Sequence, residues 1–500
     1  AAALATGAAR VPAHIDLARF YLARGFYVEA KGILDVVLAE MKAGEEDAAT
    51  LMVHAAASAL ASRPEVALAD LANPTVATNL DSQLWKALAY ARQGKWADAR
   101  EKFKNVEFSI AALPLDLQRI VIVEAFRAAL AVRDYPGAAA RSNDLDVVGV
   151  PPELAAQVAV LRGRLAEALG RDQDALAEFA TAAASADRPS AVAAQLDTIA
   201  LRQKREEISE DEALRDLEIL SAIWRGDATE MKTLEMLGHI YAGRGRYMDA
   251  LSAARVATQL APNSEVARKV QDEASSLFEQ IYNGGKGEEL PPVEALAMFY
   301  EYRDLTPIGR RGDEMIRRLA DRLVAVDLLE KASELLQYQV DHRLEGAARA
   351  QVAARLAMVY LMSRKPERAI AALRTTRIAD LAGELRQQRL LLEARAQGDV
   401  GRHDLALDII SNIGGREAVR LRSDIYWGAR RWRESAEQIE LLYGDRWRDF
   451  QPLTALEKSD VIRAAIGYAL AEDAIGLARF REKYGPKMDG EGDRAAFDAA

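Results

Sequence analysis

The feature that most constrains the fold is a spacing of small and aromatic residues within 237–262, which read LGHIYAGRGRYMDALSAARVATQLAP. Counted from Ala250, the members of this pattern are Gly238, Tyr241, Gly245 and Tyr247 before it, and Ala254, Ala257 and Pro262 after it. Intervals of three, four and seven residues place side chains on one face of a helix. The pattern therefore predicts two antiparallel helices that approach closely at Gly238 and Ala250, turn at Gly245 and stop at Pro262.

The same register recurs along most of the chain. Clear copies contain Ala18, Tyr21, Gly25 and Ala30; Ala87, Tyr90, Gly94 and Ala99; Gly163, Ala166, Gly170 and Ala175; Ala357, Tyr360 and Ala369; and Ala394, Gly401 and Ala406. Weaker copies centre on Ala67, Ala138, Ala213, Ala332, Ser435 and Gly476. The pattern resembles the tetratricopeptide repeat, a helix–turn–helix unit of about 34 residues. The resemblance implies an all-α fold, namely a right-handed α–α superhelix (a tetratricopeptide-like solenoid) of about twelve helix pairs.

The copies are unevenly spaced, and the most loop-like segment between them is NGGKGEELPP, which ends at Pro292. We expect a disordered stretch or linker at 1–10, an acidic N-terminal array at 11–283, a joint at 284–292, an arginine-rich array at 293–485, and a polar, fraying tail at 486–500. Basic and acidic residues are equal in number in 293–500, so the net charge of −10 comes from the residues before them. A codon bias toward arginine is sufficient to explain the arginine excess.

Composition restricts the partners and the compartment. The 500 residues include no cysteine, which excludes disulfides, thiolate catalysis and cysteine-held metals. In a bacterial protein this lack slightly favours the periplasm over the cytoplasm. The acidic balance argues against a nucleic-acid partner, and no apolar run approaches the ~18 residues that a membrane span needs. We expect a protein or peptide partner, no nucleic acid and no membrane span in this chain, and oligomer formation is left open.

Signatures of catalysis are missing from the sequence. GRGRYM at 243–248 is not a dinucleotide fingerprint, because Met248 stands where the third glycine belongs. The five histidines are scattered, without a pair at metal-ligand spacing on a helix. We therefore expect no enzyme, no catalytic residue, no cofactor and no metal.

In the resembled family, a peptide lies along a concave groove lined by the first helix of each pair. The repeat register places Lys232 of the best copy on this face, and it selects further residues in the arginine-rich array. Segment 425–450 also concentrates Trp, Tyr and Arg, the residue types that dominate binding hot spots. The candidate partner-binding residues are Arg317, Met358, Arg395, Arg420, Trp427, Arg430 and Arg431. Packing of Trp432 and Tyr443 between helices is the alternative for the aromatic segment.

These patterns favour a non-enzymatic scaffold that binds a partner segment or subunit along the superhelix. Two alternatives stay open. In the first, the chain is a periplasmic structural component of an envelope machine for polysaccharide export, secretion or motility. In the second, it is the helical arm of a peptidoglycan- or carbohydrate-active assembly whose catalytic domain lies outside it.

Overall fold

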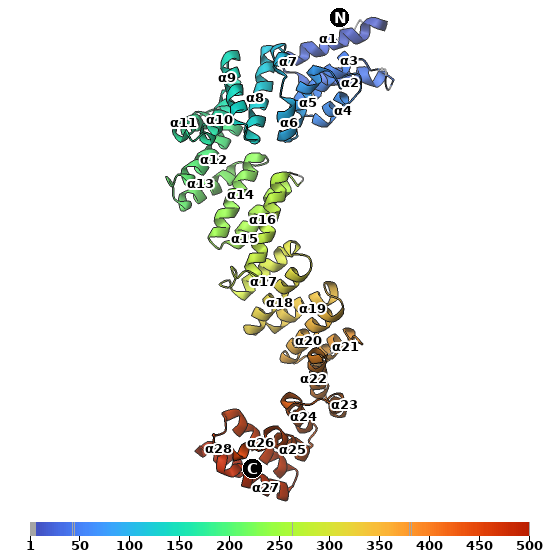
Figure 1. The fold of residues 1–500 in the computed structure, drawn as a ribbon, viewed down its shortest axis with the longest axis vertical. Helices are drawn as coiled ribbons and strands as arrows, with labels where there is room; N and C mark the ends of the chain where they lie inside the picture. The colour runs from blue at the N-terminus through green and yellow to red at the C-terminus, as the bar shows by residue number, and fades with distance from the viewer. Residues whose placement is uncertain are drawn as a thin grey trace. The chain divides into compact units, whose positions relative to one another are not determined.

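A computed structural model describes residues 7–42, 44, 46–262, 264–379, 381 and 383–499 of the chain. They belong to two compact units, Ala1–Pro262 and Asn263–Ala500, whose helices are labelled in Figure 1. All regular structure within the described ranges is helical, as the alanine-rich repeats predict. None of the helices in these ranges is long and apolar enough to cross a membrane.

Helical hairpins make up nearly all of the N-terminal unit. Its elements are η2 (Gly7–Ala9), α1 (Arg10–Leu22), α2 (Tyr27–Glu40), α3 (Ala48–Leu60), α4 (Pro64–Leu71), α5 (Leu80–Arg92), α6 (Trp96–Lys102), α7 (Glu107–Ala111), α8 (Leu115–Ala131), α9 (Tyr135–Val148), α10 (Pro152–Ala168), α11 (Asp172–Ala183), α12 (Arg188–Lys204), α13 (Glu210–Ile223), α14 (Ala228–Gly243) and α15 (Tyr247–Leu260). The hairpins are α1–α2, α3–α4, α5–α6, α8–α9, α10–α11, α12–α13 and α14–α15.

The C-terminal unit begins with two less regular helices and continues with hairpins. Its elements are α16 (Glu265–Tyr282), α17 (Pro292–Glu301), η3 (Arg303–Leu305), α18 (Arg310–Ala325), α19 (Leu329–His342), α20 (Gly346–Met362), α21 (Pro366–Thr375), α22 (Gly383–Asp399), α23 (His403–Ile409), α24 (Arg416–Gly428), α25 (Trp432–Tyr443), η4 (Arg446–Arg448), α26 (Ala455–Leu470), α27 (Ala474–Tyr484), η5 (Gly485–Lys487) and α28 (Glu491–Ala499). The hairpins are α18–α19, α20–α21, α22–α23, α24–α25 and α26–α27. Over the described residues the two units thus contain twelve helix pairs, the number expected.

Every hairpin turns at one residue in the left-handed backbone region. These residues are Gly25, Ser62, Gly94, Arg133, Gly170, Glu206, Gly245, Asp327, Arg364, Gly401, Arg430 and Glu472. Glycine takes this conformation without steric cost, which explains the turn glycine at Gly245 and at its equivalents. The other turns carry charged or polar residues at the same place, so glycine alone is an incomplete marker of the repeat.

In ten of the twelve pairs, a small residue five positions after the turn lies buried where the two helices of the pair meet. The exposed fraction is 0% for Ala30, Ala67, Ala99, Ala138, Ala175, Ala332, Ala369 and Ala406, 3% for Ala250 and 1% for Ser435. A larger side chain at this position would push the two helices apart, because protein interiors are close-packed. The small residues on which the repeat was aligned therefore do form the contact between helices.

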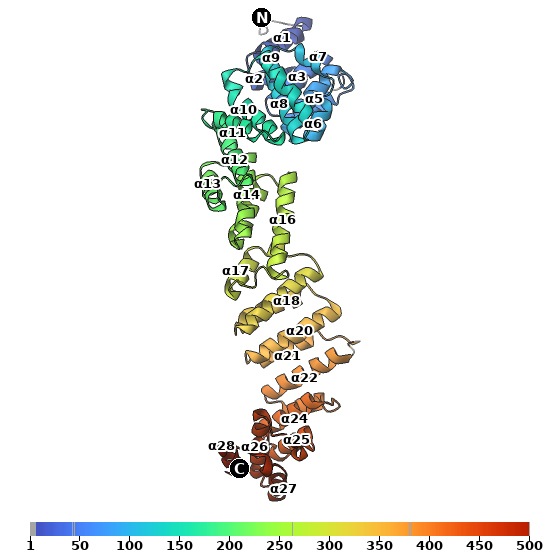
Figure 2. The ribbon, with the colours of Figure 1, turned by 60° about the vertical axis from the view of Figure 1, so that its left-hand side comes forward.

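First helices of consecutive pairs lie side by side. In the N-terminal unit, α1, α3, α5, α8, α10, α12 and α14 follow one another in an unbroken row. In the C-terminal unit, α20, α22 and α24 do the same, and Figure 2 shows them in this order, with α21 between α20 and α22. First helices thus build a continuous face of the N-terminal unit and of the three middle pairs of the C-terminal unit, as the repeat resemblance implies.

The boundaries of the chain's parts differ from those expected. Along the chain the two compact units divide after Pro262. The expected joint at 284–292 lies inside the C-terminal unit, where Tyr282 Oη donates to the Ala295 carbonyl at 2.6 Å. The expected polar tail at 486–500 contains η5 and α28, and α28 is anchored by Phe497, which is 1% exposed. Of the expected linker 1–10, residues 1–6 lie outside the described ranges, while Gly7–Ala9 form a 3-10 helix and α1 begins at Arg10.

Candidate functional site

A large cleft of the N-terminal unit lies on the face built from first helices. Its volume is 910 Å³, and helices α8, α10, α12 and α14 contribute most of its lining. We call it the N-terminal cleft and define it by Leu130, Val160, Leu161, Arg164, Leu196 and Lys232. Val160, Leu161 and Leu196 are buried, so they give the cleft an aliphatic floor.

Two cations of this cleft share one buried carboxylate. Arg164 Nε lies 2.6 Å from Asp197 Oδ2, and Lys232 Nζ lies 2.8 Å from Asp197 Oδ1. Asp197 is only 3% exposed, whereas both cationic side chains are partly exposed. The three residues come from α10, α12 and α14, so a single carboxylate links three successive first helices and leaves an excess positive charge.

A related arrangement occurs two first helices earlier in the row. Glu124 of α8, which is 5% exposed, lies 3.6 Å from Arg92 Nη2 of α5 and 3.9 Å from Arg127 Nε of its own helix. Arg127 lines the N-terminal cleft beside Arg164. Along this face, therefore, two buried carboxylates each hold a pair of partly exposed cations.

The acidic residues that line the cleft cap helices. Asp187 accepts a hydrogen bond from Ser190 N at 3.3 Å at the start of α12. Asp227 accepts from Thr229 N at 2.8 Å and from Trp224 Nε1 at 2.9 Å at the start of α14. Their charges are opposed by the positive ends of two helix dipoles.

The sequence located only part of this cleft. The register placed Lys232 on the first-helix face, and it lines the cleft. Arg127, Arg164 and the two buried acids were missed because acidic residues are abundant in the sequence and each looks solvated when it is taken alone. One signal was present: Arg164 and Lys232 stand 33 and 35 residues from Asp197, about one repeat on either side.

A smaller cleft in the C-terminal unit brings two of the predicted partner-binding residues together. Its volume is 290 Å³, and Arg317, Asp321, Gln351, Met358 and Gln388 contribute to it from α18, α20 and α22. The repeat register predicted Arg317 and Met358 to lie on the inner face. Register counting therefore identifies correctly which side chains of neighbouring first helices share a face.

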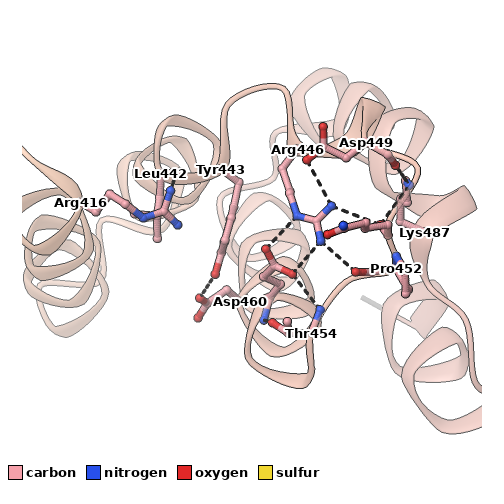
Figure 3. A network of polar contacts seen from close by, with 11 residues as sticks. Arg416, Leu442, Tyr443, Arg446, Asp449, Pro452, Thr454, Asp460 and Lys487 are labelled. Carbon is pink, nitrogen blue, oxygen red and sulfur yellow. Dashed lines mark hydrogen bonds and ion pairs between the residues drawn. The ribbon is translucent and has the colours of Figure 1, made fainter.

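Of the remaining candidates, Arg395 is exposed on α22, whereas Arg420 is engaged in a contact between helices. Arg420 of α24 is ion-paired with Asp460 of α26, and Tyr443 Oη donates to the same carboxylate at 2.5 Å. Figure 3 shows the Tyr443–Asp460 bond beside Arg416, which donates to the Leu442 carbonyl at 3.2 Å. Arg420 thus has a packing role in the second unit.

Trp427 is also held by neighbouring residues. Its ring makes an edge contact with Trp432 at 4.9 Å between centroids, and the Arg463 guanidinium lies 4.8 Å from its ring centre. Arg463 is fixed in turn by Asp424 at 2.6 Å. One ring face of Trp427 is therefore covered, in line with the packing alternative for the aromatic segment.

Arg430 and Arg431 belong to the turn between α24 and α25. Arg430 is the exposed left-handed turn residue, with φ of 62°. Arg431 stacks on the Tyr426 ring at 4.7 Å and bonds Glu434 at 2.9 Å. Arg430 is thus an exposed turn residue, and Arg431 stabilises its own hairpin.

Arg446 fixes the loop after this hairpin, as Figure 3 shows. Its guanidinium bonds Glu457 at 2.9 and 3.2 Å and the Pro452 carbonyl at 2.8 Å. The hydrogen bond from Arg446 lowers the pKa of Glu457, which also closes a capping box with Thr454 at the start of α26. Much of the Arg- and Trp-rich segment that the sequence singled out thus builds the last repeats.

His54 is a buried titratable group in the N-terminal unit. Its Nδ1 lies 2.7 Å from Asp70 Oδ2 and its Nε2 lies 2.9 Å from Asp35 Oδ1, so α3 is tied to both α2 and α4. Burial lowers the pKa of His54, but the two carboxylates outweigh burial and raise it above the ordinary value of 6.5. Asp35 stays ionised in this range, because hydrogen bonds from Lys31 and His54 outweigh its burial and lower its pKa.

We expect the stability of the N-terminal unit to fall as the pH rises through the raised pKa of His54. A pKa that is higher in the folded state means that the imidazolium stabilises the fold below pH 6.5 and that this contribution is lost at higher pH. Thermal denaturation in buffers from mildly acidic to mildly alkaline pH measures this dependence of stability on pH. His54→Gln should flatten this dependence and His14→Gln should leave it intact; an unchanged slope in His54→Gln contradicts the assignment.

Comparison with known proteins finds likeness at the level of structure. No model of a known protein family matches the chain, and no curated protein matches it. A tetratricopeptide repeat protein from Parabacteroides merdae is similar, with 11% identity, a TM-score of 0.26, and coverage of 54% of this chain and 97% of that one. The APC/C hetero-tetramer Cut9-Hcn1 gives 12% identity, a TM-score of 0.27, and coverage of 90% and 89%. The pentatricopeptide repeat protein PPR10 from maize is 16% identical, with a TM-score of 0.32 and coverage of 97% of this chain and 68% of that one.

These superpositions are loose, so the repeat class rests on the chain's own helix pairs. Each pair has a left-handed turn residue, and in most pairs a buried small residue follows five positions later, as in the register read from Ala250. First helices then pack on the first helices of the next pair. By the architecture of its repeats, the chain is a tetratricopeptide-like α-helical repeat protein.

Proposed function

We propose that the chain is a non-enzymatic scaffold that holds a segment of a partner protein in the N-terminal cleft. The observation that carries the proposal is the cleft itself, 910 Å³ in volume and built by four successive first helices. Ligand sites in proteins are commonly concavities of about 300–1,000 Å³ with an apolar lining and a few placed polar groups. The aliphatic floor and the carboxylate-held cations of this cleft fit that description.

The shape of the row of first helices favours an extended ligand. Because α8, α10, α12 and α14 each present side chains to one cleft, a bound segment contacts several repeats at once. Repeat arrays use such continuous faces as binding surfaces. The smaller cleft around Arg317 and Met358 offers a second surface of the same kind in the C-terminal unit.

The proposal predicts that filling the cleft blocks partner binding. Ala168 is an exposed cleft residue at the end of α10, so Ala168→Trp places a large ring in the cleft without disturbing the core. We expect binding to weaken about tenfold or more, since a bulky group would exclude the ligand from part of its site. Ala155→Trp is the matched control, because Ala155 is exposed on the same helix and is not among the cleft residues.

The partner segment is found by photo-crosslinking from a benzoylphenylalanine at Gln157, inside the cleft, and its affinity is then measured with a synthetic peptide of the crosslinked sequence. A recurrent segment that binds the Ala155→Trp variant and fails to bind the Ala168→Trp variant supports the proposal. Equal binding by both variants places the partner elsewhere on the protein and overturns it.

A further inference from the structure

We propose that the N-terminal cleft selects partner segments that carry carboxylate side chains within an aliphatic stretch, an inference that rests on the proposed scaffold function. The ligand class is an acidic, extended peptide. Its carboxylates would meet Arg127, Arg164 and Lys232, and its aliphatic side chains would lie on the floor formed by Val160, Leu161 and Leu196.

Cationic side chains line the cleft, although the unit around it is acidic. Acidic residues outnumber basic ones in Ala1–Pro262, yet the lining of the cleft includes Arg127, Arg133, Arg164 and Lys232 against two aspartates that cap helices. Counted with the buried Asp197 and Glu124, acids equal these four cations in number, but those two acids are buried while the cations they pair with are partly exposed. An anionic group that approaches from solvent therefore meets mainly cationic side chains at this one place on an acidic unit. The distribution therefore favours specific capture of an acidic segment over general adhesion of anions.

The two arginines are held in a way that leaves their terminal nitrogens available. Among the contacts of the described residues, Arg164 meets Asp197 through Nε and Arg127 meets Glu124 through Nε. A guanidinium anchored at Nε can still offer its two Nη groups to a second carboxylate, in the bidentate geometry that such pairs prefer. Because Asp197 and Glu124 are buried, they cannot turn outward and compete for these donors in solvent. Their role is to position the cations.

The lining favours a peptide over a nucleic acid. Nucleic-acid affinity arises from many phosphate contacts and from stacking of bases on aromatic rings. This cleft has few cations, and its floor is aliphatic, with Trp96 and Tyr135 as its aromatic lining. An aliphatic floor matches leucine or valine side chains between the acidic residues of a peptide.

The test uses the whole chain and fluorescein-labelled peptides of defined composition. One peptide alternates Glu and Leu, a second replaces each Glu by Gln, a third replaces it by Lys, and a single-stranded RNA of equal charge is the fourth probe. We expect the Glu peptide to bind, with an affinity that falls as salt is added, because exposed charge pairs are screened. The Gln peptide should bind at least about tenfold more weakly, the effect of losing one charge-assisted contact.

Substitutions in the cleft distinguish the positioning of the cations by buried acids from the effect of their charge alone. Arg164→Gln and Lys232→Gln should each weaken the Glu peptide about tenfold and leave the Gln peptide unchanged. Arg162→Gln, on the same helix but paired with Asp146 away from the cleft, is the control and should change neither. Asp197→Asn makes the cleft more positive, so charge alone would tighten binding, whereas loss of positioning should weaken it. Thermal denaturation of each variant confirms that the unit is folded, and Arg164→Lys keeps the charge if Arg164→Gln does not fold.

Each outcome decides the matter. Preference for the Glu peptide that is lost in Arg164→Gln and Lys232→Gln supports the inference. Equal binding of the Glu and Gln peptides, or no binding of any peptide, overturns it, while the scaffold proposal is judged separately by the Ala168→Trp experiment. Tighter binding by Asp197→Asn overturns the positioning role of the buried acid. Preferential binding of the RNA overturns both the inference and the choice of a protein partner.

Discussion

Replacement of Arg389 by Ala is expected to lower the free energy of unfolding of the C-terminal unit by about 3 kcal/mol, because several buried acceptors lose their donor. Arg389 of α22 is 7% exposed, and burial lowers the pKa of its guanidinium. The side chain donates to the carbonyl of Ala350 in α20 and, at 2.8 Å, to the carbonyl of Leu373 in α21. It also bonds Thr376 O at 3.2 Å and Thr376 Oγ1 at 3.0 Å.

These bonds explain why the loss should be large. The last carbonyls of a helix have no partner within the helix, and those of α21 end in the interior of the unit. One guanidinium satisfies them and at the same time ties α22 to both helices of the preceding pair. A methyl side chain removes this donor, and a buried acceptor that loses its donor costs about 1–3 kcal/mol. Lysine cannot replace the planar fork, so Arg389→Lys should also destabilise the unit.

Chemical and thermal denaturation measure the loss, and hydrogen exchange locates it. Protection should fall first in α20, α21 and α22, since repeats depend on their neighbours for stability. Arg386→Ala is the matched control, because Arg386 is exposed on the same helix, and it should change stability by no more than about 0.5 kcal/mol. Equal effects of the two substitutions contradict the structural role given to Arg389.

Arginines that donate to the backbone carbonyls of a neighbouring helix recur in other repeats of this unit. They give a physical reason for part of the arginine excess. Arg349 of α20 donates to the Val340 carbonyl of α19 at 2.9 Å. Arg422 of α24 donates to the Ile410 and Ile413 carbonyls after α23 at 3.1 and 3.0 Å. Arginine suits this task because its guanidinium stays charged and offers several donors in one plane. Codon bias is thus not the whole explanation for arginine in the C-terminal unit.

The sequence predicted the repeat architecture because that architecture depends on local rules. The register of Ala250 fixes a turn, a close contact and two helix faces within one repeat, and all three are found. The same register placed Arg317 and Met358 in one cleft, because neighbouring repeats present equivalent positions to the same face. Contacts that depend on one repeat alone, or on equivalence between repeats, were therefore predictable.

Contacts that depend on a particular pair of repeats were not predictable. Arg420 looks like an exposed cation by register, but Asp460 lies opposite it on the next first helix. Likewise, nothing in the local pattern distinguishes Asp197, which is buried between two cations, from the many solvated acids of the chain. The division at Pro262 was missed for a similar reason, because loop composition marks 284–292 while the hydrogen bond from Tyr282 to Ala295 joins the two sides of that segment within one unit.

Glycine in the first helix has two different roles, and a pair of substitutions separates them. Gly163 of α10 packs under Phe179 of α11, which is fully buried, and a Cβ at Gly163 would lie 2.5 Å from the Phe179 ring. Overpacking of this kind costs about 1–3 kcal/mol. At the equivalent Gly238 of α14, a Cβ would lie 3.7 Å from the Ala250 carbonyl, which is an ordinary contact.

Gly163→Ala is therefore expected to destabilise the N-terminal unit by about 2 kcal/mol, even though alanine improves helix propensity by up to about 1 kcal/mol. Gly238→Ala should keep that gain in propensity and raise stability by up to about 1 kcal/mol. Denaturation of the two variants, with hydrogen exchange over α10 and α11, measures the difference. Gly163→Ala combined with Phe179→Leu should recover part of the loss, since the two positions share one space. If Gly163→Ala is as stable as Gly238→Ala, α10 and α11 do not approach as closely as their backbones indicate, and the small residue in the repeat register reflects the turn and helix propensity alone.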